Sequence, residues 1–240
     1  MTNNIFTNSI KKQTLNLVFV IDNSGSMDGS KISAVNNAIR DVMFTLPEIQ
    51  EETSDVQIMV SALEFNDEAA WIYNEPKTID DFKWRDLDAD GTTNLSDAYD
   101  KLSSFLSKRK DGGMMPDFGG VAPIIILMSD GEPTSNDWPD HLQSLQNKPW
   151  FKAALKYALS IQCDGENELN VLISFTGNRE TVLKVYSAEA LRKVIKVIAV
   201  TSSKIKSTSS SFAFLNQSSQ DEAINVEIRD SLADIDDVQW

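Results

Sequence analysis

The sequence is poor in residue types that several common functions require. It contains a single cysteine, Cys163, and a single histidine, His141. One cysteine excludes an intramolecular disulfide, so the chain needs no oxidising compartment, and one histidine excludes a histidine-rich zinc site. We expect Cys163 to be a small core residue and His141 to lie at the surface or to cap a helix.

Long apolar runs and positive charge are also scarce. No run approaches the roughly 20 apolar residues of a membrane span, and residues 1–13 lack the apolar stretch of a signal peptide. Asp and Glu number 36 against 22 Lys and Arg, which gives a net charge of −14. Because like charges repel, this balance disfavours nonspecific binding to nucleic acid or anionic lipid. We therefore expect a cytoplasmic protein that binds neither nucleic acid nor membrane.

Apolar residues nevertheless make up 41% of the 240 residues, enough for the core of one large domain. Short apolar runs rich in β-branched residues and bounded by Gly, Asp or Ser are typical of buried strands. Such runs occupy residues 15–21, 56–65 and 121–128, and weaker ones occupy 157–163 and 182–186. These segments are predicted to be strands.

Between these runs, apolar residues recur at the three- and four-residue spacing of an amphipathic helix. The segments with this spacing are 31–46, 94–106, 140–155 and 188–200. We expect Pro47 to close the first helix and Pro149 to break the third, because proline lacks the amide hydrogen of the helix ladder. Ser30, Ser96 and Ser187 are candidate N-caps.

Strands that alternate with helices predict a doubly wound α/β fold, in which helices cover both faces of a mostly parallel sheet. We place this domain at residues 14–203, after a polar N-terminal segment at 1–13. Residues 204–240 are expected to be a Ser-rich linker and an acidic C-terminal tail. The tail is either a mobile acidic arm or an added edge element, since it contains enough apolar residues to dock.

Polar turns follow two of the predicted strands and precede one helix. Residues 22–26 (Asp-Asn-Ser-Gly-Ser) follow the first strand, and residues 129–131 (Ser-Asp-Gly) follow the strand at 121–128. In open parallel sheets, ligands bind beyond the carboxyl ends of strands, near the switch in strand order. If these two strands are neighbours, both turns converge with a third at 91–93 (Gly-Thr-Thr).

The converging turns supply hard oxygen ligands. These are the carboxylates of Asp22 and Asp130 and the hydroxyls of Ser24, Ser26 and Thr93. Such ligands suit Mg²⁺, with Mn²⁺ and Ca²⁺ as alternatives. Because the site has only two protein anions, the metal stays electron-poor and can accept an external carboxylate. The first turn alone fits a capped turn without metal equally well, and only the combination favours a metal site.

These residues resemble the metal-ion-dependent adhesion site, or MIDAS, of von Willebrand factor A (VWA) domains. The MIDAS pattern is Asp-x-Ser-x-Ser, a later Thr, and a later Asp in a Thr-Asp-Gly turn. The matching residues are Asp22, Ser24, Ser26, Thr93 and Asp130. The resemblance covers roughly residues 15–203. Two departures, Ser129 for the usual Thr and Tyr99 for a Leu, remove no ligand.

The resemblance implies a six-stranded, mostly parallel sheet and a metal bound directly by Ser24 and Ser26. It further implies that Thr93 binds directly in some states and that Asp22 and Asp130 often act through water. A partner's Asp or Glu then completes the coordination sphere. We therefore expect a metal-dependent protein-binding domain without catalytic residues.

Finer features are similar to the intracellular bacterial branch related to TerY, the VWA protein of tellurite-resistance clusters. They lie at residues 34–39, 128–134, 175–178, 188–191 and 200–203. This branch is associated with stress-response systems that contain protein kinases and phosphatases. The resemblance therefore implies a bacterial stress-response or defence system, with a kinase or phosphatase as partner.

Two alternative functions would use the same site. The first is an adaptor for an AAA+ ATPase, as in other intracellular VWA proteins, which changes only the partner. The second is a metal-dependent, phosphatase-like hydrolase that uses a metal-bound water. The sequence disfavours the hydrolase, because it shows neither an obvious base near Ser24 and Ser26 nor a basic phosphate-binding cluster.

Overall fold

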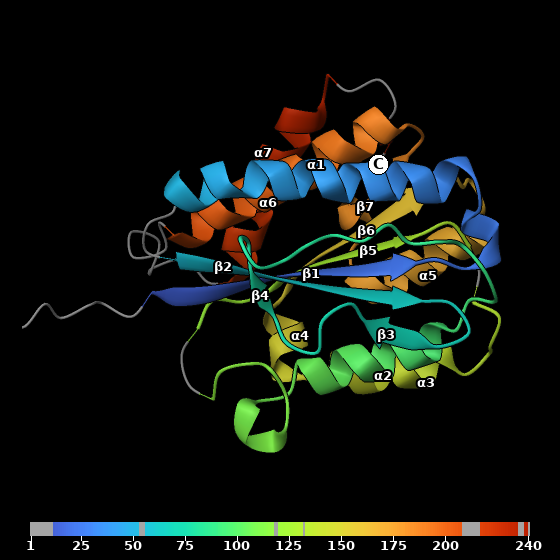
Figure 1. The fold of residues 1–240 in the computed structure, drawn as a ribbon, viewed down its shortest axis with the longest axis horizontal. Helices are drawn as coiled ribbons and strands as arrows, with labels where there is room; N and C mark the ends of the chain where they lie inside the picture. The colour runs from blue at the N-terminus through green and yellow to red at the C-terminus, as the bar shows by residue number, and fades with distance from the viewer. Residues whose placement is uncertain are drawn as a thin grey trace, which may run out of the picture.

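The computed structural model describes residues 12–52, 56–117, 120–131, 133–207, 217–234 and 238–239. In these residues the chain forms one sheet of eight strands with helices on both faces (Figure 1). The strands are β1 (Gln13–Asp22), β2 (Val56–Phe65), β3 (Ala69–Trp71), β4 (Lys77–Thr78), β5 (Ile124–Ser129), β6 (Leu155–Ile161), β7 (Val182–Val185) and β8 (Val238–Gln239). The α-helices are α1 (Ser30–Glu52), α2 (Leu95–Phe105), α3 (Trp138–Gln146), α4 (Pro149–Ala153), α5 (Glu166–Thr176), α6 (Ala188–Ser207) and α7 (Gln217–Leu232).

Five strands form the parallel centre of the sheet, in the spatial order β2-β1-β5-β6-β7. The short strands β3 and β4 pair antiparallel with β2, and β8 pairs antiparallel with β7. The doubly wound α/β class is therefore confirmed. The five strands predicted from apolar runs correspond to β1, β2, β5, β6 and β7. With β3, β4 and β8 the described sheet has eight strands rather than the six that the resemblance implies, and these three are too brief to leave a periodic signal in the sequence.

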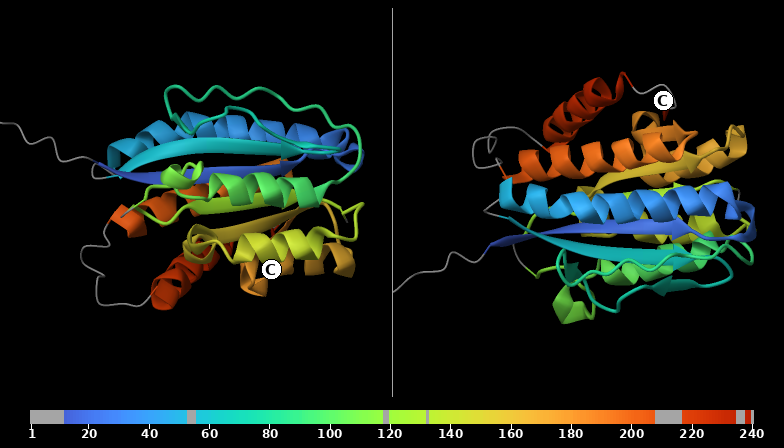
Figure 2. Two further views of the ribbon diagram at one scale, coloured as in Figure 1. Left: turned by 90° about the horizontal axis from the view of Figure 1, so that it is seen from below. Right: turned by 45° about the horizontal axis from the view of Figure 1, so that its top comes forward.

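Helices cover both faces of the sheet (Figure 2), and each face carries a separate hydrophobic core. Along β1, Leu17 and Phe19 pack with α1, α6 and α7, whereas Val18 and Val20 pack with α2, α3 and α5. This alternation follows from the two-residue period of a strand. Each of these side chains is at most 1% exposed, so each stabilises the fold by about 1.5 to 3 kcal/mol. Strand β1 is thus fixed from both faces, as is the position of the turn that follows it.

Helix α1 continues through Pro47 to Glu52, so the expectation that Pro47 closes it is wrong. The last turns dock on the sheet, where Ile49 is buried. The Gln50 side chain donates to the Val56 carbonyl at 2.7 Å and accepts from the Ile58 amide at 2.8 Å. These contacts offset the missing amide hydrogen of the proline.

The expected break at Pro149 in the predicted helix at 140–155 is confirmed. The segment forms two helices, α3 and α4, the second of which begins at Pro149, and β6 already begins at Leu155. Helix α5 has no counterpart in the prediction. Ser187 is confirmed as an N-cap, because its hydroxyl accepts from the Ala190 amide at 3.1 Å. Ser96 is not a cap: it lies inside α2, which is capped by the Asn94 side chain.

The described part of the C-terminal region is docked on the domain. Helix α7 packs against α6, with Ile228 and Leu232 at most 2% exposed in the core shared with α1 and α6. Strand β8 extends the sheet beside β7. Helix α6 runs past residue 203 to Ser207, and the predicted boundaries at 13 and 203 stay predictions. Residues 1–11 and 208–216, which include most of the expected N-terminal segment and part of the Ser-rich linker, lie outside the described residues.

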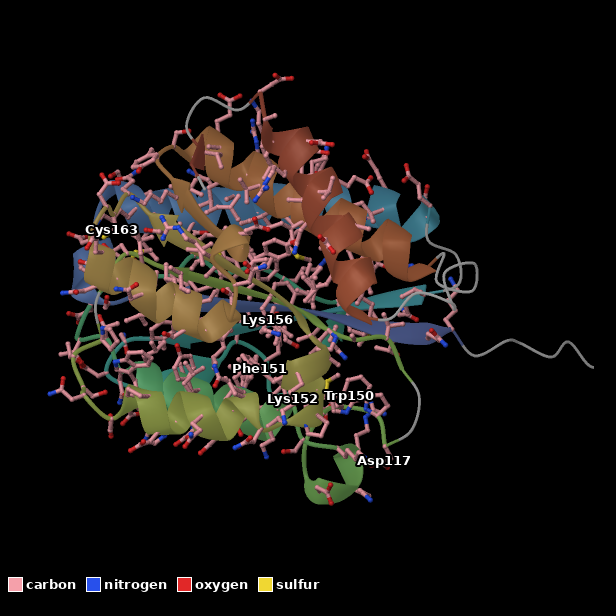
Figure 3. The ribbon with its side chains drawn as sticks, turned by 180° about the vertical axis from the view of Figure 1, so that it is seen from behind. Asp117, Trp150, Phe151, Lys152, Lys156 and Cys163 are labelled. Carbon is pink, nitrogen blue, oxygen red and sulfur yellow. The ribbon has the colours of Figure 1, made fainter. Side chains whose placement is uncertain are left out.

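The two scarce residue types occupy different surroundings. Cys163 is half-buried just after β6 (Figure 3) rather than in the core, and burial raises the pKa of its thiol. His141 lies partly exposed on α3, where Nδ1 is 2.8 Å from Oδ1 of Asp100 on α2. In the described part of the chain, no helix is long and apolar enough to cross a bilayer.

Candidate metal centre

The carboxyl ends of β1 and β5 lie side by side at one edge of the sheet. The two strands pair in parallel, with Ile21 opposite Met128. The chain passes from β1 to β2 on one side and later reaches β5 on the other, so strand order reverses here (Figure 1). A ligand site is expected at such a reversal. The two predicted turns therefore start from adjacent positions.

Asp22 is the most deeply buried group of the site, with none of its surface exposed. Its Oδ1 accepts from the Ser24 amide at 2.9 Å, and its Oδ2 accepts from the Ser129 hydroxyl at 2.6 Å. Burial raises the pKa of the Asp22 carboxyl, because it removes water from the charged form, while the bonds from Ser129 and Ser24 oppose this rise. Among the described residues Asp22 forms no ion pair, so its charge lacks a cationic partner.

Asp130 belongs to a second hydrogen-bonded chain. The Ser24 and Ser26 hydroxyls lie 3.1 Å apart, and the Ser26 hydroxyl donates to Asp130 Oδ1 at 2.7 Å. The Lys31 ammonium donates to Asp130 Oδ2, and to the Ser26 carbonyl at 3.3 Å. The Asp130 side chain is 1% exposed and that of Lys31 is 25% exposed. Direct hydrogen bonds thus connect four of the five predicted site residues, Asp22, Ser24, Ser26 and Asp130.

The loop that carries Thr93 is held against both turns by the backbone. The Gly25 amide donates to the Gly91 carbonyl at 3.0 Å, and the Thr134 amide donates to the Thr93 carbonyl at 3.0 Å. A Cβ on Gly25 would lie 3.2 Å from that Gly91 oxygen, so a larger residue here would push the two loops apart by a few tenths of an ångström. Thr93 itself is buried. The structure therefore brings all three predicted loops together.

The sequence pattern of the von Willebrand factor type A domain matches residues 16–201. The chain belongs to this family. VWA domains typically mediate protein–protein interactions and commonly bind a divalent metal at a MIDAS.

Among curated proteins, this VWA domain is similar to the inter-alpha-trypsin inhibitor heavy chain H1 of Sus scrofa, with 29% identity over 154 residues. That match covers 61% of this chain but only 16% of the relative's length. Among solved structures it is similar to proximal thread matrix protein 1 from the mussel byssus with a zinc-occupied MIDAS motif, at a TM-score of 0.53 and 17% identity over 80% of this chain and 48% of that one. It is also similar to the ArnB paralog VWA2 from Sulfolobus acidocaldarius, at a TM-score of 0.54 and 19% identity over 76% of this chain and 44% of that one. At these identities the structural likeness shows the fold alone.

The donor set of this VWA domain fits a hard divalent cation. Among the described residues, no three His, Cys, Asp or Glu side chains gather as a metal cluster. A cation here would therefore rely on two carboxylates and several hydroxyls, which are oxygen donors of the kind that Mg²⁺ prefers. The buried Asp22 carboxylate, which lacks a positive partner, is the observation that favours such an ion.

Two residues that the sequence did not mark as ligands hold this region in place. Lys31 binds Asp130, and its signal in the sequence was its position in the first turn of a helix, where the dipole disfavours a positive charge. Asp67 accepts from the Thr92 amide at 2.8 Å and from its hydroxyl at 2.7 Å. These bonds lower the pKa of the Asp67 carboxyl, and they anchor the loop just before Thr93.

Proposed function

We propose that this VWA domain is a metal-dependent protein-binding module. Five residues would hold the cation: Asp22, Ser24, Ser26, Thr93 and Asp130. The observation that carries the proposal is the hydrogen-bonded set that links Ser129, Asp22, Ser24, Ser26 and Asp130 at the point where strand order reverses. Mg²⁺ is the expected ion, with Mn²⁺ or Ca²⁺ as alternatives.

The charges of these residues favour capture of an acidic partner. Asp22 and Asp130 carry two negative charges, and Lys31 offsets one of them. When bound, a divalent cation would supply an electron-accepting position for an Asp or Glu of a protein partner. Ser24 is buried whereas Ser26 is exposed, so a partner would approach from the Ser26 side. The residues of this chain thus orient the donors and leave one side of the site open.

A binding role is favoured over a hydrolytic one. The hydroxyls of Ser24 and Ser26 bond to each other, and that of Ser26 donates to Asp130, so among the described residues neither bonds to a histidine or lysine side chain. The nearest basic group, Lys31, is bound to Asp130, and His141 bonds to Asp100 instead. We therefore propose that the domain is not an enzyme. Turnover of a phosphomonoester with Mg²⁺ or Mn²⁺ that disappears in Asp130→Asn would revive the phosphatase-like alternative.

We also propose a cytoplasmic setting in a bacterial stress-response or defence system. The support is the similarity of residues 128–134 and 188–191 to the TerY-related, tellurium-resistance branch, together with the acidic charge. A protein kinase or phosphatase is the first candidate partner, and an AAA+ ATPase is the second. Both would engage the same cation through a carboxylate.

Partner capture with and without chelation tests the proposal. Wild type, Ser26→Ala and the control Ser33→Ala are cross-linked in lysate of the source cells with Mg²⁺ or with EDTA. Ser33 is exposed on α1 and lies outside the donor set, so its variant matches the chemical change. We expect proteins captured by wild type and Ser33→Ala in Mg²⁺, and lost with EDTA or in Ser26→Ala. Identical capture by all three proteins under both conditions would refute the proposal.

A further inference from the structure

Two large apolar side chains stand exposed in the described part of the chain. Phe44 on α1 is 87% exposed and Val226 on α7 is 54% exposed. Both lie in the helical layer formed by α1, α6 and α7 (Figure 2). Helix α6 packs between the other two, so the exposed side chains flank it on opposite sides. An isolated apolar side chain is ordinary on a surface, but each of these two lies in a charged groove.

The groove around Phe44 is basic. It has a volume of about 370 Å³ between α1 and α6, and its charged residues are Asp41, Arg192, Lys193 and Lys196. Arg192 pairs with Asp41 at 3.2 Å, and Lys193 pairs with Glu189 at 2.8 Å. Lys196 forms no ion pair among the described residues. The groove lining therefore carries two net positive charges, on a protein whose total charge is −14. Glu189, which lies outside the lining, compensates Lys193, so Lys196 is the uncompensated charge.

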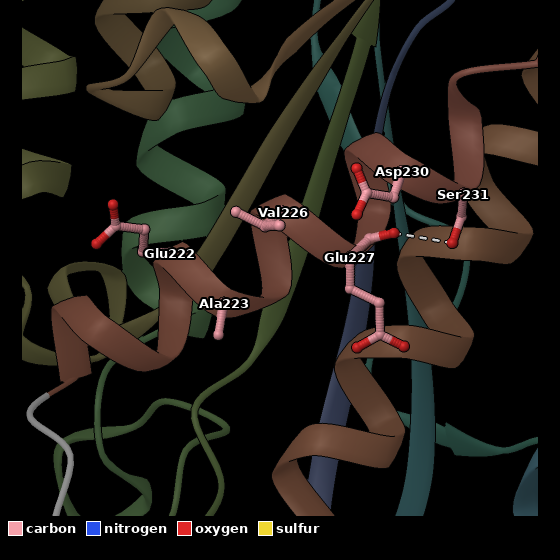
Figure 4. Close-up of a pocket in the computed structure, with 6 residues that line it drawn as sticks. All are labelled: Glu222, Ala223, Val226, Glu227, Asp230 and Ser231. Carbon is pink, nitrogen blue, oxygen red and sulfur yellow. Dashed lines mark hydrogen bonds between the residues drawn. The ribbon is translucent and has the colours of Figure 1, made fainter.

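The groove around Val226 is acidic. It has a volume of about 770 Å³ along α7, and its described lining includes Glu222, Glu227 and Asp230 but no Lys or Arg (Figure 4). Ser231 in the same lining donates to the Glu227 carbonyl at 2.8 Å. The opposite side of α7 is buried on the domain through Ile228. The acidic groove thus lies on the outer side of α7, where no described element covers it.

We propose that the α1-α6-α7 layer is a dimer interface between two copies of this chain. The basic groove with Phe44 in one copy takes the acidic face of α7 with Val226 in the other, and the reverse contact forms about a two-fold axis. A two-fold interface repeats each contact twice, so two modest complementary patches act together. Repulsion between two chains of charge −14 is confined by screening to about 8 Å at physiological salt, whereas the grooves meet at contact distance.

The dimer would leave the metal centre free. Phe44 lies 13 residues after Lys31 on α1, which is about 20 Å at 1.5 Å per residue. A dimer through this layer therefore presents two metal centres at once. Bivalent presentation strengthens the capture of a partner that carries two acidic sites. The interface itself rests on the two grooves and does not depend on the cation.

Sedimentation velocity of the full chain over a range of concentrations at physiological ionic strength tests the interface. We expect wild type to form dimers, and Phe44→Ser to raise the dissociation constant by about tenfold or more, as for a central interface aromatic. About 1 M salt is expected to weaken the dimer, because the Debye length then falls to about 3 Å. A wild type that stays monomeric, or a dimer unchanged in Phe44→Ser, would overturn the proposal.

Charge reversal makes the test specific. Lys196→Glu and Glu227→Lys each place like charges at both copies of the contact, so each variant alone is expected to be monomeric. Mixed together, the two variants restore opposite charges at both contacts and are expected to form heterodimers. Lys101→Glu, an exposed reversal on α2 on the other side of the sheet, is the control and should dimerise as wild type does. Failure of the mixture to associate contradicts the proposed pairing.

Discussion

Replacing Lys31 is expected to tighten cation binding. The Lys31 ammonium binds the Asp130 carboxylate, which is 1% exposed and therefore poorly solvated. Lys31→Met keeps most of the aliphatic stem and removes the charge. The cation-free protein then holds a buried carboxylate without a counter-charge, which destabilises it. A divalent cation next to Asp130 supplies that counter-charge, so the cation-bound protein is affected less.

The magnitude follows from the cost of breaking a buried ion pair. Removing one partner of such a pair costs about 3 to 5 kcal/mol. Lys31 is 25% exposed, so solvent reduces this cost, and we take about 1.4 to 2.8 kcal/mol for Lys31→Met. Because the substitution destabilises only the cation-free protein, the free energy of cation binding becomes more favourable by the same amount. The affinity for Mn²⁺ should therefore rise by about ten- to a hundredfold.

Isothermal titration calorimetry measures the affinity for Mn²⁺, and thermal unfolding measures the stability of the protein without and with Mn²⁺. We expect Lys31→Met to melt at a lower temperature than wild type without metal and to gain more on adding Mn²⁺. Lys101→Met, which removes an exposed charge on α2, should behave as wild type in both assays. Equal or weaker Mn²⁺ binding in Lys31→Met would refute the reasoning, because it would mean that Lys31 chiefly positions Asp130 for the metal.

His141 has a pKa above its usual value of 6.5, mainly because of its hydrogen bond to Asp100. A raised pKa in the folded state stabilises the protein below about pH 6.5, and this stabilisation is lost as pH rises through the folded pKa. The melting temperature should therefore fall from about pH 6 to 8 more in wild type than in His141→Gln. Parallel curves of melting temperature against pH would contradict this. Leu46→Ala, in the core, should cost about 2 to 5 kcal/mol in urea unfolding. Phe44→Ala on the same helix should change stability by less than about 0.5 kcal/mol at a protein concentration at which the chain is monomeric. Gly91 has a φ of +76°, and a Cβ there would lie 2.9 Å from a neighbouring carboxyl, so Gly91→Ala should destabilise the fold by about 1 kcal/mol or more and weaken Mn²⁺ binding. An Mn²⁺ affinity equal to that of wild type would show that this loop does not shape the site.

The donor residues could be placed from the sequence because two strands fix them. The apolar runs that become β1 and β5 end at Asp22 and Ser129, and parallel neighbours bring their carboxyl ends to one edge. Burial on both faces makes such strands easy to recognise. The sequence predicted convergence of the turns only if the two strands are neighbours, and the pairing of β1 with β5 meets that condition.

Other features depended on contacts that local sequence does not encode. The Lys31 partner lies 99 residues away in the chain, and the Asp67 partner lies 25 residues away. Helix α5 was missed although Leu169, Leu172 and Phe175 recur at the three-residue spacing of an amphipathic helix and are buried on one face. Pro47 remains helical because tertiary contacts of the following turn outweigh its local preference.

The most direct test of the metal centre is a calorimetric titration of Mn²⁺ into wild type, Ser26→Ala and Ser33→Ala. Ser26 lies just before α1 and Ser33 lies in the first turn of that helix. Only Ser26 bonds to Ser24 and Asp130. We predict one cation per chain in wild type and in Ser33→Ala, and no measurable binding in Ser26→Ala. Absence of binding to wild type, or equal binding by all three proteins, would contradict the assignment of this site.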